Sequence, residues 1–328
     1  MILTVTLNTA IDRTVAVPNF QLGRRHRAVE SRTVAGGKGI NVARALRLLG
    51  KPVIATGFVG GGTGRRVLSQ LDAEGILHDF APIAGETRTN LSVVDPTTGE
   101  QTEINERGPE VTGVDLEDFI EKLLYLASGA RICVLAGSVP PGAPADVYAT
   151  LISELRSRDV LTVLDTDGDP MRAGLRGEPA VVAPNVREAE EAVGHEFSEP
   201  EDLALGLTGL IEMGADEAII TTEYGCNAVV GPDRRGYEVS IEPLEPVATV
   251  GSGDAFLAGY VAARYEGADE GDCLAFGVAC GAESTQHFGA GTLAPREVDR
   301  LVSRVQVTEL PPPAGGVERR VASRAAAD

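Results

Sequence analysis

The sequence is poor in residues that bind metals or form disulfides. It has four cysteines and four histidines among 328 residues. The cysteines show no CxxC spacing, so we expect buried free thiols in a reducing compartment. The histidines lack metal-ligand spacing, and no apolar run reaches the roughly eighteen residues of a membrane helix. The start, MILTVTLNTAIDRTV, lacks the features of a signal peptide, so a cytoplasmic protein without a membrane partner is expected.

Positive charge is also scarce. The 29 lysines and arginines face 48 aspartates and glutamates, which gives a formal net charge of −19. Such a surface argues against nucleic acid and anionic membranes as partners. A phosphorylated ligand would be repelled by the overall field, so it would need a few cations gathered at its binding site.

Short β-branched runs alternate with stretches of helical period. The runs are ILTVTLN, VIATGFV, RICVLAG, VLTVLD, AVVAPN and EAIITT, and NVARALRLLG and ADVYATLISELRSR are among the stretches between them. This alternation predicts an α/β fold, with a doubly wound, mostly parallel sheet flanked by helices. Ligands of such sheets bind at the carboxyl ends of the strands.

Two segments interrupt the alternation. Residues 13–34 lack a helical period, and residues 88–106 resemble a hairpin with a turn at residues 95–99. They are either two surface hairpins or a small second sheet that acts as a lid over the strand ends. We therefore expect one domain over residues 1–309 with both segments inserted, followed by a mobile tail at 310–328, which opens with prolines and glycines.

Two glycine-rich stretches precede helical patterns. In VGSGDAFLAGY, residues 251–253 could offer free backbone N–H groups to an anion, and Asp254 could accept a proton. The alternative is a glycine turn with Asp254 as a helix cap. In AGGKGINVARALRLLG, three glycines surround Lys38 and precede Asn41. Close approach of a polyhydroxy ligand would explain so many glycines, but a turn before an amphipathic helix is the simpler alternative.

Single polar residues follow several predicted strands. Each is by itself more often a cap or turn residue, but the carboxyl ends of parallel strands share one edge of the sheet, so we expect a common site. These residues are Asp12, Ser138, Asp165, Asn185 and Glu188. The inserted segments add Arg25, Arg27 and Arg88, whose guanidinium groups either bind phosphate oxygens or belong to a solvated surface.

The two glycine-rich stretches together resemble the two signatures of the phosphofructokinase B family of ribokinase-like sugar kinases. The resemblance covers roughly residues 1–305, and TLNTAID, ETRTN and GSVPPG are most similar to the 1-phosphofructokinase and tagatose-6-phosphate kinase branch. It implies a ribokinase-like fold with a small β-sheet lid. It also implies a carbohydrate kinase that uses ATP and Mg²⁺ and forms a homodimer.

The resemblance implies roles for single residues on the sugar side. Asp254 would deprotonate the acceptor hydroxyl, and the backbone of Gly251, Ser252 and Gly253 would stabilise the charge that develops during transfer. The residues implied to hold sugar hydroxyls are Asp12, Gly37, Lys38 and Asn41. The residues implied to hold the phosphate of the sugar are Arg88, Arg25 and Arg27, with Ser138 nearby.

On the nucleotide side, the resemblance implies that Asn185 and Glu188 organise Mg²⁺ through water and that Thr222 lines the nucleotide pocket. The reaction it favours is ATP-dependent phosphorylation of fructose 1-phosphate to fructose 1,6-bisphosphate. The same chemistry on tagatose 6-phosphate or fructose 6-phosphate is the nearest alternative. A non-catalytic sugar-phosphate sensor on the same fold is another, but a sensor has no need of a base at Asp254.

Overall fold

The structure is a computed structural model, and it describes residues 1–310. Residues 311–328, which make up nearly all of the expected tail, lie outside the described residues. Leu310 itself belongs to a strand, in which it lies opposite Gly236. Within residues 1–310, none of the helices has the length and apolar character needed to cross a membrane.

The centre of the main sheet consists of six parallel strands in the order β12-β11-β10-β9-β1-β4. Their bounds are β1 Ile2–Thr6, β4 Val53–Gly60, β9 Ile132–Ala136, β10 Leu161–Asp165, β11 Val181–Val182 and β12 Glu217–Thr222. Each corresponds to one of the six runs predicted from the sequence. Successive side chains enter opposite cores: Ile132 packs on one face of the sheet and Cys133 on the other.

Both edges of the main sheet extend beyond these six strands. Beside β4 lie β5 (Leu77–His78) and β6 (Ala81–Ile83). Beyond β12 follow three antiparallel strands, β13 (Gly225–Val230), β14 (Arg235–Ser240) and β15 (Gln306–Leu310). The alternation of strands and helices does not predict this antiparallel edge, because β13 and β14 are joined by a short turn and not by a helix.

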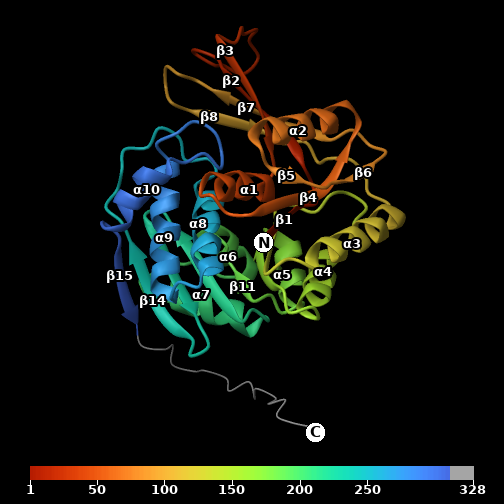
Figure 1. Ribbon diagram of the computed structural model, residues 1–328. Helices are drawn as coiled ribbons and strands as arrows, with labels where there is room; N and C mark the ends of the chain where they lie inside the picture. The colour runs from red at the N-terminus through yellow and green to blue at the C-terminus, as the bar shows by residue number, and fades with distance from the viewer. Residues whose placement is uncertain (311–328) are drawn as a thin grey trace.

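Helices cover both faces of the main sheet, as predicted for a doubly wound fold (Figure 1). One face carries α1 Lys38–Leu48, α2 Gly61–Glu74, α8 Ser252–Glu266, α9 Glu270–Ser284 and α10 Pro295–Val302. The other carries α3 Gly113–Ala127, α4 Val147–Arg156, α5 Gly168–Leu175, α6 Val186–Val193 and α7 Pro200–Glu212. Helices α8 and α9 pack so closely that a Cβ on Gly259 would lie 2.7 Å from Cys280 Sγ. All four cysteines are buried free thiols, as expected.

A separate four-stranded sheet projects from the body at the top of Figure 1. Its order is β3-β2-β7-β8, with bounds β2 Ala10–Ala16, β3 Glu30–Gly36, β7 Arg88–Val94 and β8 Gln101–Ile104. The small second sheet predicted from the two inserted segments is therefore present. The Asp95 carboxylate at the β7–β8 turn accepts hydrogen bonds from the N–H groups of Asn19 and Phe20, so it ties the two segments together.

Candidate active site

The N-terminus of α8 is formed by a glycine turn that leaves backbone N–H groups free in the described part of the chain. Gly251 caps the helix with φ of 84°, and a Cβ there would lie 2.5 Å from Ala290 Cβ, so only glycine fits. Within residues 1–310, the backbone N–H groups of Gly253 and Asp254 have no acceptor, and a Cβ on Gly253 would meet nothing within 4 Å. Free N–H groups at the positive end of a helix dipole suit a phosphoryl oxygen.

Asp254 lies in the first turn of the same helix, but its side chain does not cap it. The residue is 7% exposed, and its Oδ2 accepts a hydrogen bond of 2.8 Å from Asn41 Nδ2. Burial raises the pKa of Asp254 to about 7; the charge of Asp165 adds to the shift, and Lys38 and Asn41 oppose it. A carboxyl group with this pKa can accept a proton near neutral pH.

Lys38 connects Asp254 to two further carboxylates. Its Nζ lies 2.8 Å from Asp165 Oδ1 and 3.0 Å from Glu188 Oε1. Burial alone would lower the pKa of Lys38, but the charges of Asp165, Glu188 and Asp254 raise it above its usual value. Lys38 is therefore a permanent cation among three acids. The sequence indicated Asp165 only as a polar residue at a strand end, without a role.

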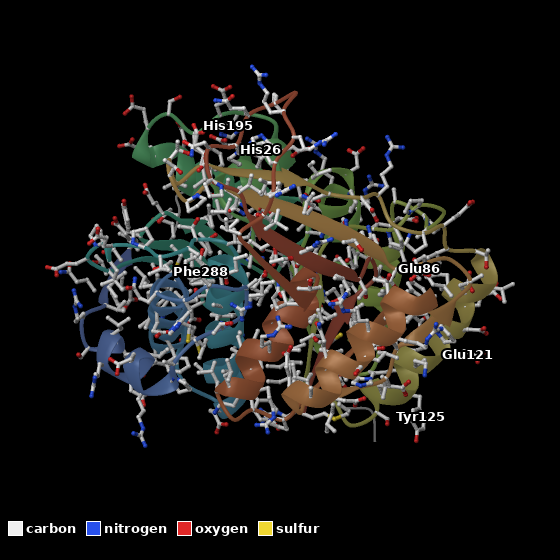
Figure 2. The ribbon with its side chains drawn as sticks, turned by 90° about the horizontal axis from the view of Figure 1, so that it is seen from above. His26, Glu86, Glu121, Tyr125, His195 and Phe288 are labelled. Atoms are coloured by element: carbon white, nitrogen blue, oxygen red, sulfur yellow. The ribbon has the colours of Figure 1, made fainter. Side chains whose placement is uncertain are left out.

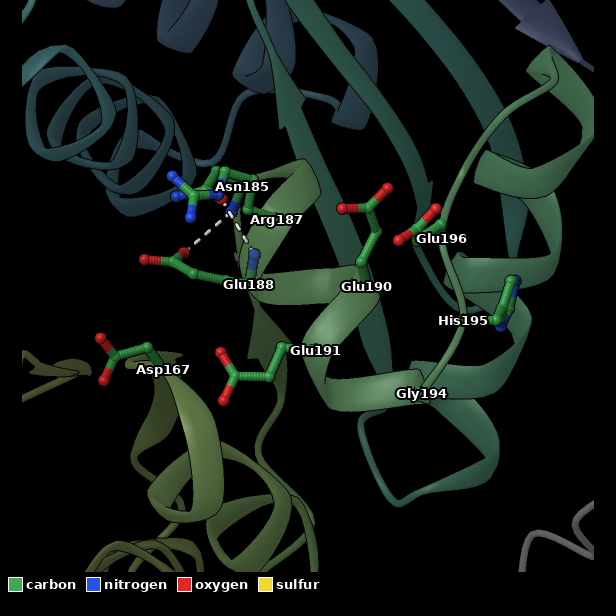
Figure 3. Close-up of a pocket in the computed structure, with 9 residues that line it drawn as sticks. All are labelled: Asp167, Asn185, Arg187, Glu188, Glu190, Glu191, Gly194, His195 and Glu196. Atoms are coloured by element: carbon green, nitrogen blue, oxygen red, sulfur yellow. Dashed lines mark hydrogen bonds between the residues drawn. The ribbon is translucent and has the colours of Figure 1, made fainter.

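Asn185 and Glu188 form a reciprocal cap at the start of α6 (Figure 3). Asn185 Oδ1 accepts a bond of 3.0 Å from the Glu188 N–H, and Glu188 Oε2 accepts one of 2.9 Å from the Asn185 N–H. This fixes one oxygen of Glu188 and leaves the other for Lys38. Burial raises the pKa of Glu188, and the charge of Lys38 opposes the shift. The residues flank a pocket of about 590 Å³ with four further carboxylates, from Asp167, Glu190, Glu191 and Glu196.

Asp12 lies on the small sheet next to the first glycine-rich stretch. Its Oδ1 accepts a hydrogen bond of 2.8 Å from Asn90 Nδ2, a partner that the sequence did not indicate. Burial raises the pKa of Asp12, and the Asn90 bond and the charge of Arg88 oppose the shift. A Cβ on Gly36 would lie 1.9 Å from Asp12 Oδ2, so the glycine makes room for this carboxylate.

The other two glycines of this stretch also pack against protein. Gly37 has φ of 110°, and a Cβ on it would lie 2.5 Å from Thr6 Cγ2; one on Gly39 would lie 2.6 Å from the Val5 carbonyl oxygen. Contacts with β1 and β2 therefore require glycine at all three positions. The packing interpretation explains the glycines, and the same stretch delivers Lys38 and Asn41 to the site; the approach of a ligand to this backbone stays a prediction.

Arg88 lines a pocket of about 690 Å³ at the base of the small sheet, together with Arg107. Its Nε donates to the Asn8 carbonyl (3.1 Å) and its Nη1 to the Glu106 carbonyl (2.9 Å). Asn8 Nδ2 also donates to Ser138 Oγ (3.1 Å) and to the Arg107 carbonyl (3.0 Å). Asn8 thus joins the predicted residues Arg88 and Ser138. The sequence analysis missed Asn8 and Arg107; the position of Arg107 just after the predicted hairpin was the available signal.

Arg25 and Arg27 lie away from the Arg88 pocket of their own chain. Both are exposed on the loop between β2 and β3. In the described part of the chain, neither makes a hydrogen bond or an ion pair, and neither lines the Arg88 pocket. In the view from above, Phe288 and Glu86 lie on either side of the small sheet (Figure 2).

Thr222 and the α8 N-terminus share a third pocket, of about 290 Å³. Thr222 lies at the end of β12, and Ser252, Gly253 and Phe256 lie opposite it. The pocket combines apolar walls with the free N–H groups of α8. This combination suits a ligand with a flat apolar part and an anionic part.

A buried carboxylate beside a helix N-terminus, at the carboxyl edge of a doubly wound sheet, is an arrangement suited to phosphoryl transfer. The family model described as "pfkB family carbohydrate kinase" matches residues 3–297. The chain therefore belongs to the pfkB family of carbohydrate kinases, an enzyme family whose activity implies ATP as phosphoryl donor.

Individual relatives cover almost the whole chain. A 1-phosphofructokinase of Borreliella burgdorferi is 32% identical over 94% of this chain and 99% of its own. Phosphofructokinase-2 from Escherichia coli, in a tetrameric inhibited form, has a TM-score of 0.85 at 27% identity, with 92% and 98% of the two chains covered. Ribokinase of Arabidopsis thaliana, at 20% identity and TM-score 0.77 over 92% and 98%, shares the fold.

Proposed function

We propose that this kinase transfers the terminal phosphoryl group of ATP to fructose 1-phosphate and forms fructose 1,6-bisphosphate. The observation that carries the proposal is the pair of guanidinium-bearing residues, Arg88 and Arg107, in one pocket beside Asp12. Arg88 is held by the Asn8 and Glu106 carbonyls. Three glutamates also line the pocket, namely Glu86, Glu106 and Glu110. A sugar phosphate offers the two guanidinium groups an anion for charge-assisted hydrogen bonds, whereas an unphosphorylated sugar does not. The similarity to a 1-phosphofructokinase supports this choice of sugar phosphate.

The proposed chemistry assigns one step to each group. Asp12 and Asn41 orient the sugar, with Gly37 and Lys38 beside it and Ser138 near its phosphate. Asp254 takes the proton of the acceptor hydroxyl of the sugar. The hydroxyl oxygen forms a bond to the γ-phosphorus of ATP, and the bond between this phosphorus and the oxygen that stays with ADP breaks. The free N–H groups after Gly251 stabilise the charge on the transferred group, with Ser252 as a small neighbour. Thr222 lines the nucleotide pocket.

Mg²⁺ fits the acidic side of the site. Beside Glu188, the groove at the start of α6 carries the carboxylates of Asp167, Glu190, Glu191 and Glu196, and Mg²⁺ takes one or two carboxylates together with water and substrate phosphates. Glu188, oriented by Asn185, would hold the ion through water. When bound, the ion neutralises the charge of the nucleotide phosphates. This neutralisation matters in a groove that already carries five carboxylates.

A coupled kinase assay over four sugars tests the proposal. We expect fructose 1-phosphate to give a kcat/KM at least about tenfold above fructose 6-phosphate and tagatose 6-phosphate, and far above fructose. A preference for fructose 6-phosphate is the outcome that the fructose-6-phosphate complex of E. coli phosphofructokinase-2 favours, and it would replace our assignment. A preference for fructose itself would remove the role of the Arg88 pocket.

Arg88→Ala is expected to raise the KM for the sugar phosphate by about 10- to 100-fold, because hydrogen bonds between charged groups are lost. The KM for ATP should stay within a factor of about two. Steady-state kinetics with each substrate varied in turn gives both values. Arg66→Ala, which removes an exposed arginine of α2, is the control. Equal changes in both KM values would show that Arg88 does not bind the sugar phosphate.

We further propose that residues 1–309 act as one kinase domain in the cytoplasm and that the small sheet is both a lid and a homodimer contact. The sheet and its loop expose Leu22, Val29 and Ile104 at 89%, 70% and 58%. Arg25 and Arg27 do not line the Arg88 pocket of their own chain, so in a dimer they could bind the sugar phosphate in the pocket of the second copy. The tetrameric form of E. coli phosphofructokinase-2 supports self-association. Sedimentation velocity that finds only monomers would contradict the dimer.

A further inference from the structure

Arg44, on α1, uses every N–H group of its guanidinium. Nε and Nη2 donate to the Glu74 carboxylate at 2.6 and 3.2 Å, so the pair is bidentate. Nη2 also donates to the Ala35 carbonyl (2.8 Å), and Nη1 donates to the Ala290 carbonyl (3.2 Å) and to Asn41 Oδ1 (3.1 Å). Because a guanidinium has five such donors in a fixed plane, its orientation is fully determined.

The contact with Asn41 decides which end of that amide faces Asp254. Arg44 can only donate, so it requires the amide oxygen on its own side. The NH₂ group is then left for Asp254, and Nδ2 donates to its Oδ2 at 2.8 Å. With the amide reversed, an oxygen would face the buried carboxylate and an NH₂ group would face the guanidinium, and both contacts would be repulsive.

The backbone contacts of Arg44 link the two glycine-rich stretches. Ala35 is the first residue of the first stretch, and Ala290 lies against Gly251 at the start of α8, where a Cβ on Gly251 would lie 2.5 Å from Ala290 Cβ. Gly291 packs on the Asn41 backbone, because a Cβ there would lie 2.3 Å from the Asn41 carbonyl oxygen. The Arg44 side chain thus contacts the first stretch directly and the second through Ala290.

We propose that Arg44, held by Glu74, is a positioning residue for Asp254, which acts by fixing the Asn41 amide with its N–H groups toward the carboxylate. The inference rests on the proposed role of Asp254 as the base. Arg44 itself makes no contact with Asp254, and its effect passes through Asn41. Lysine cannot replace it, because an ammonium lacks the planar fork.

A double-mutant cycle on kcat tests this route. We expect Arg44→Ala to lower kcat by about 10- to 100-fold and the KM for ATP to stay within about a factor of two. In the Asn41→Ala background, Arg44→Ala should lower kcat by less than about twofold further, because the amide through which it acts is absent. Millimolar guanidinium should restore part of kcat in Arg44→Ala and none in the double variant.

The matched control is Arg47→Ala, on the same helix, since Arg47 Nε donates only to the Gly75 carbonyl at 2.9 Å. It should leave kcat unchanged, since Arg47 is exposed and does not contact Asn41. Equal kcat losses for Arg44→Ala with and without Asn41, or no rescue by guanidinium, would overturn the positioning role. If Asp254→Asn keeps normal turnover, the role of Asp254 as the base fails, and if the parent enzyme phosphorylates none of the sugar phosphates, the proposed function fails, so these failures can be told apart from that of Arg44.

Discussion

Asp254→Asn is expected to lower kcat by about 10²- to 10⁴-fold, the usual contribution of a general base. Both KM values should stay within a few-fold, because the amide keeps the shape of the carboxylate and its contact with Asn41. Steady-state kinetics on the purified variant gives the three numbers. We propose this carboxylate as the base because it is buried and lies in the first turn of α8, next to the free N–H groups.

Asp272→Asn is the matched control for this variant. Asp272 occupies the corresponding position in the first turn of α9, where it is exposed. If Asp254 served only as a helix-terminal carboxylate, the two substitutions would have similar small effects on stability and none on kcat. A large loss of kcat confined to Asp254→Asn separates chemistry from capping.

The same residue predicts a pH dependence with a definite sign. With a pKa near 7, Asp254 is increasingly protonated below that pH, so kcat should fall toward acid and Asp254→Asn should lack this limb. Because the folded pKa is raised, the unfolded chain loses this proton first, so stability falls as pH rises from about 4 to about 7 and the loss is complete once the buried carboxyl is ionised. Thermal melts should therefore find Asp254→Asn more stable than the parent at pH 8, with the difference vanishing below about pH 4.

Local patterns were sufficient to predict the parallel core. The six central strands are short β-branched runs between helical stretches, and both signals lie within a few neighbouring residues. The hairpin at residues 88–106 was equally readable from its turn chemistry at Asp95. The antiparallel edge was missed because β13 and β14 lack the helical partners on which the alternation argument depends.

The candidate site was predictable only in part. Asp254, Asn41 and Lys38 follow glycine-rich stretches, and the structure brings them together. Asn8 and Arg44 were missed because their importance lies in contacts with residues far away in the chain, 130 positions in the case of Asn8 and Ser138. Sequence spacing carries no information about such pairs. Asn8 lies in TLNTAID and Arg44 in AGGKGINVARALRLLG, but their position in these stretches does not reveal which distant groups they contact.

Lys38→Met is expected to lower kcat by about 10²- to 10³-fold, the range seen when one electrostatic group is removed from a reaction centre. Lys38 lowers the pKa of Asp254, whereas burial and the charge of Asp165 raise it. Without the lysine, the pH at which kcat falls on the acid side of its pH profile should therefore be higher. The comparison is Lys51→Met, which removes an ion pair of 2.8 Å with the exposed Glu266 and should leave both kcat and its pH limb unchanged. An unshifted limb in Lys38→Met, measured over pH 5.5 to about 9, would mean that Asp254 does not sense the charge of Lys38. The ammonium would then act on the phosphoryl group and not on the base.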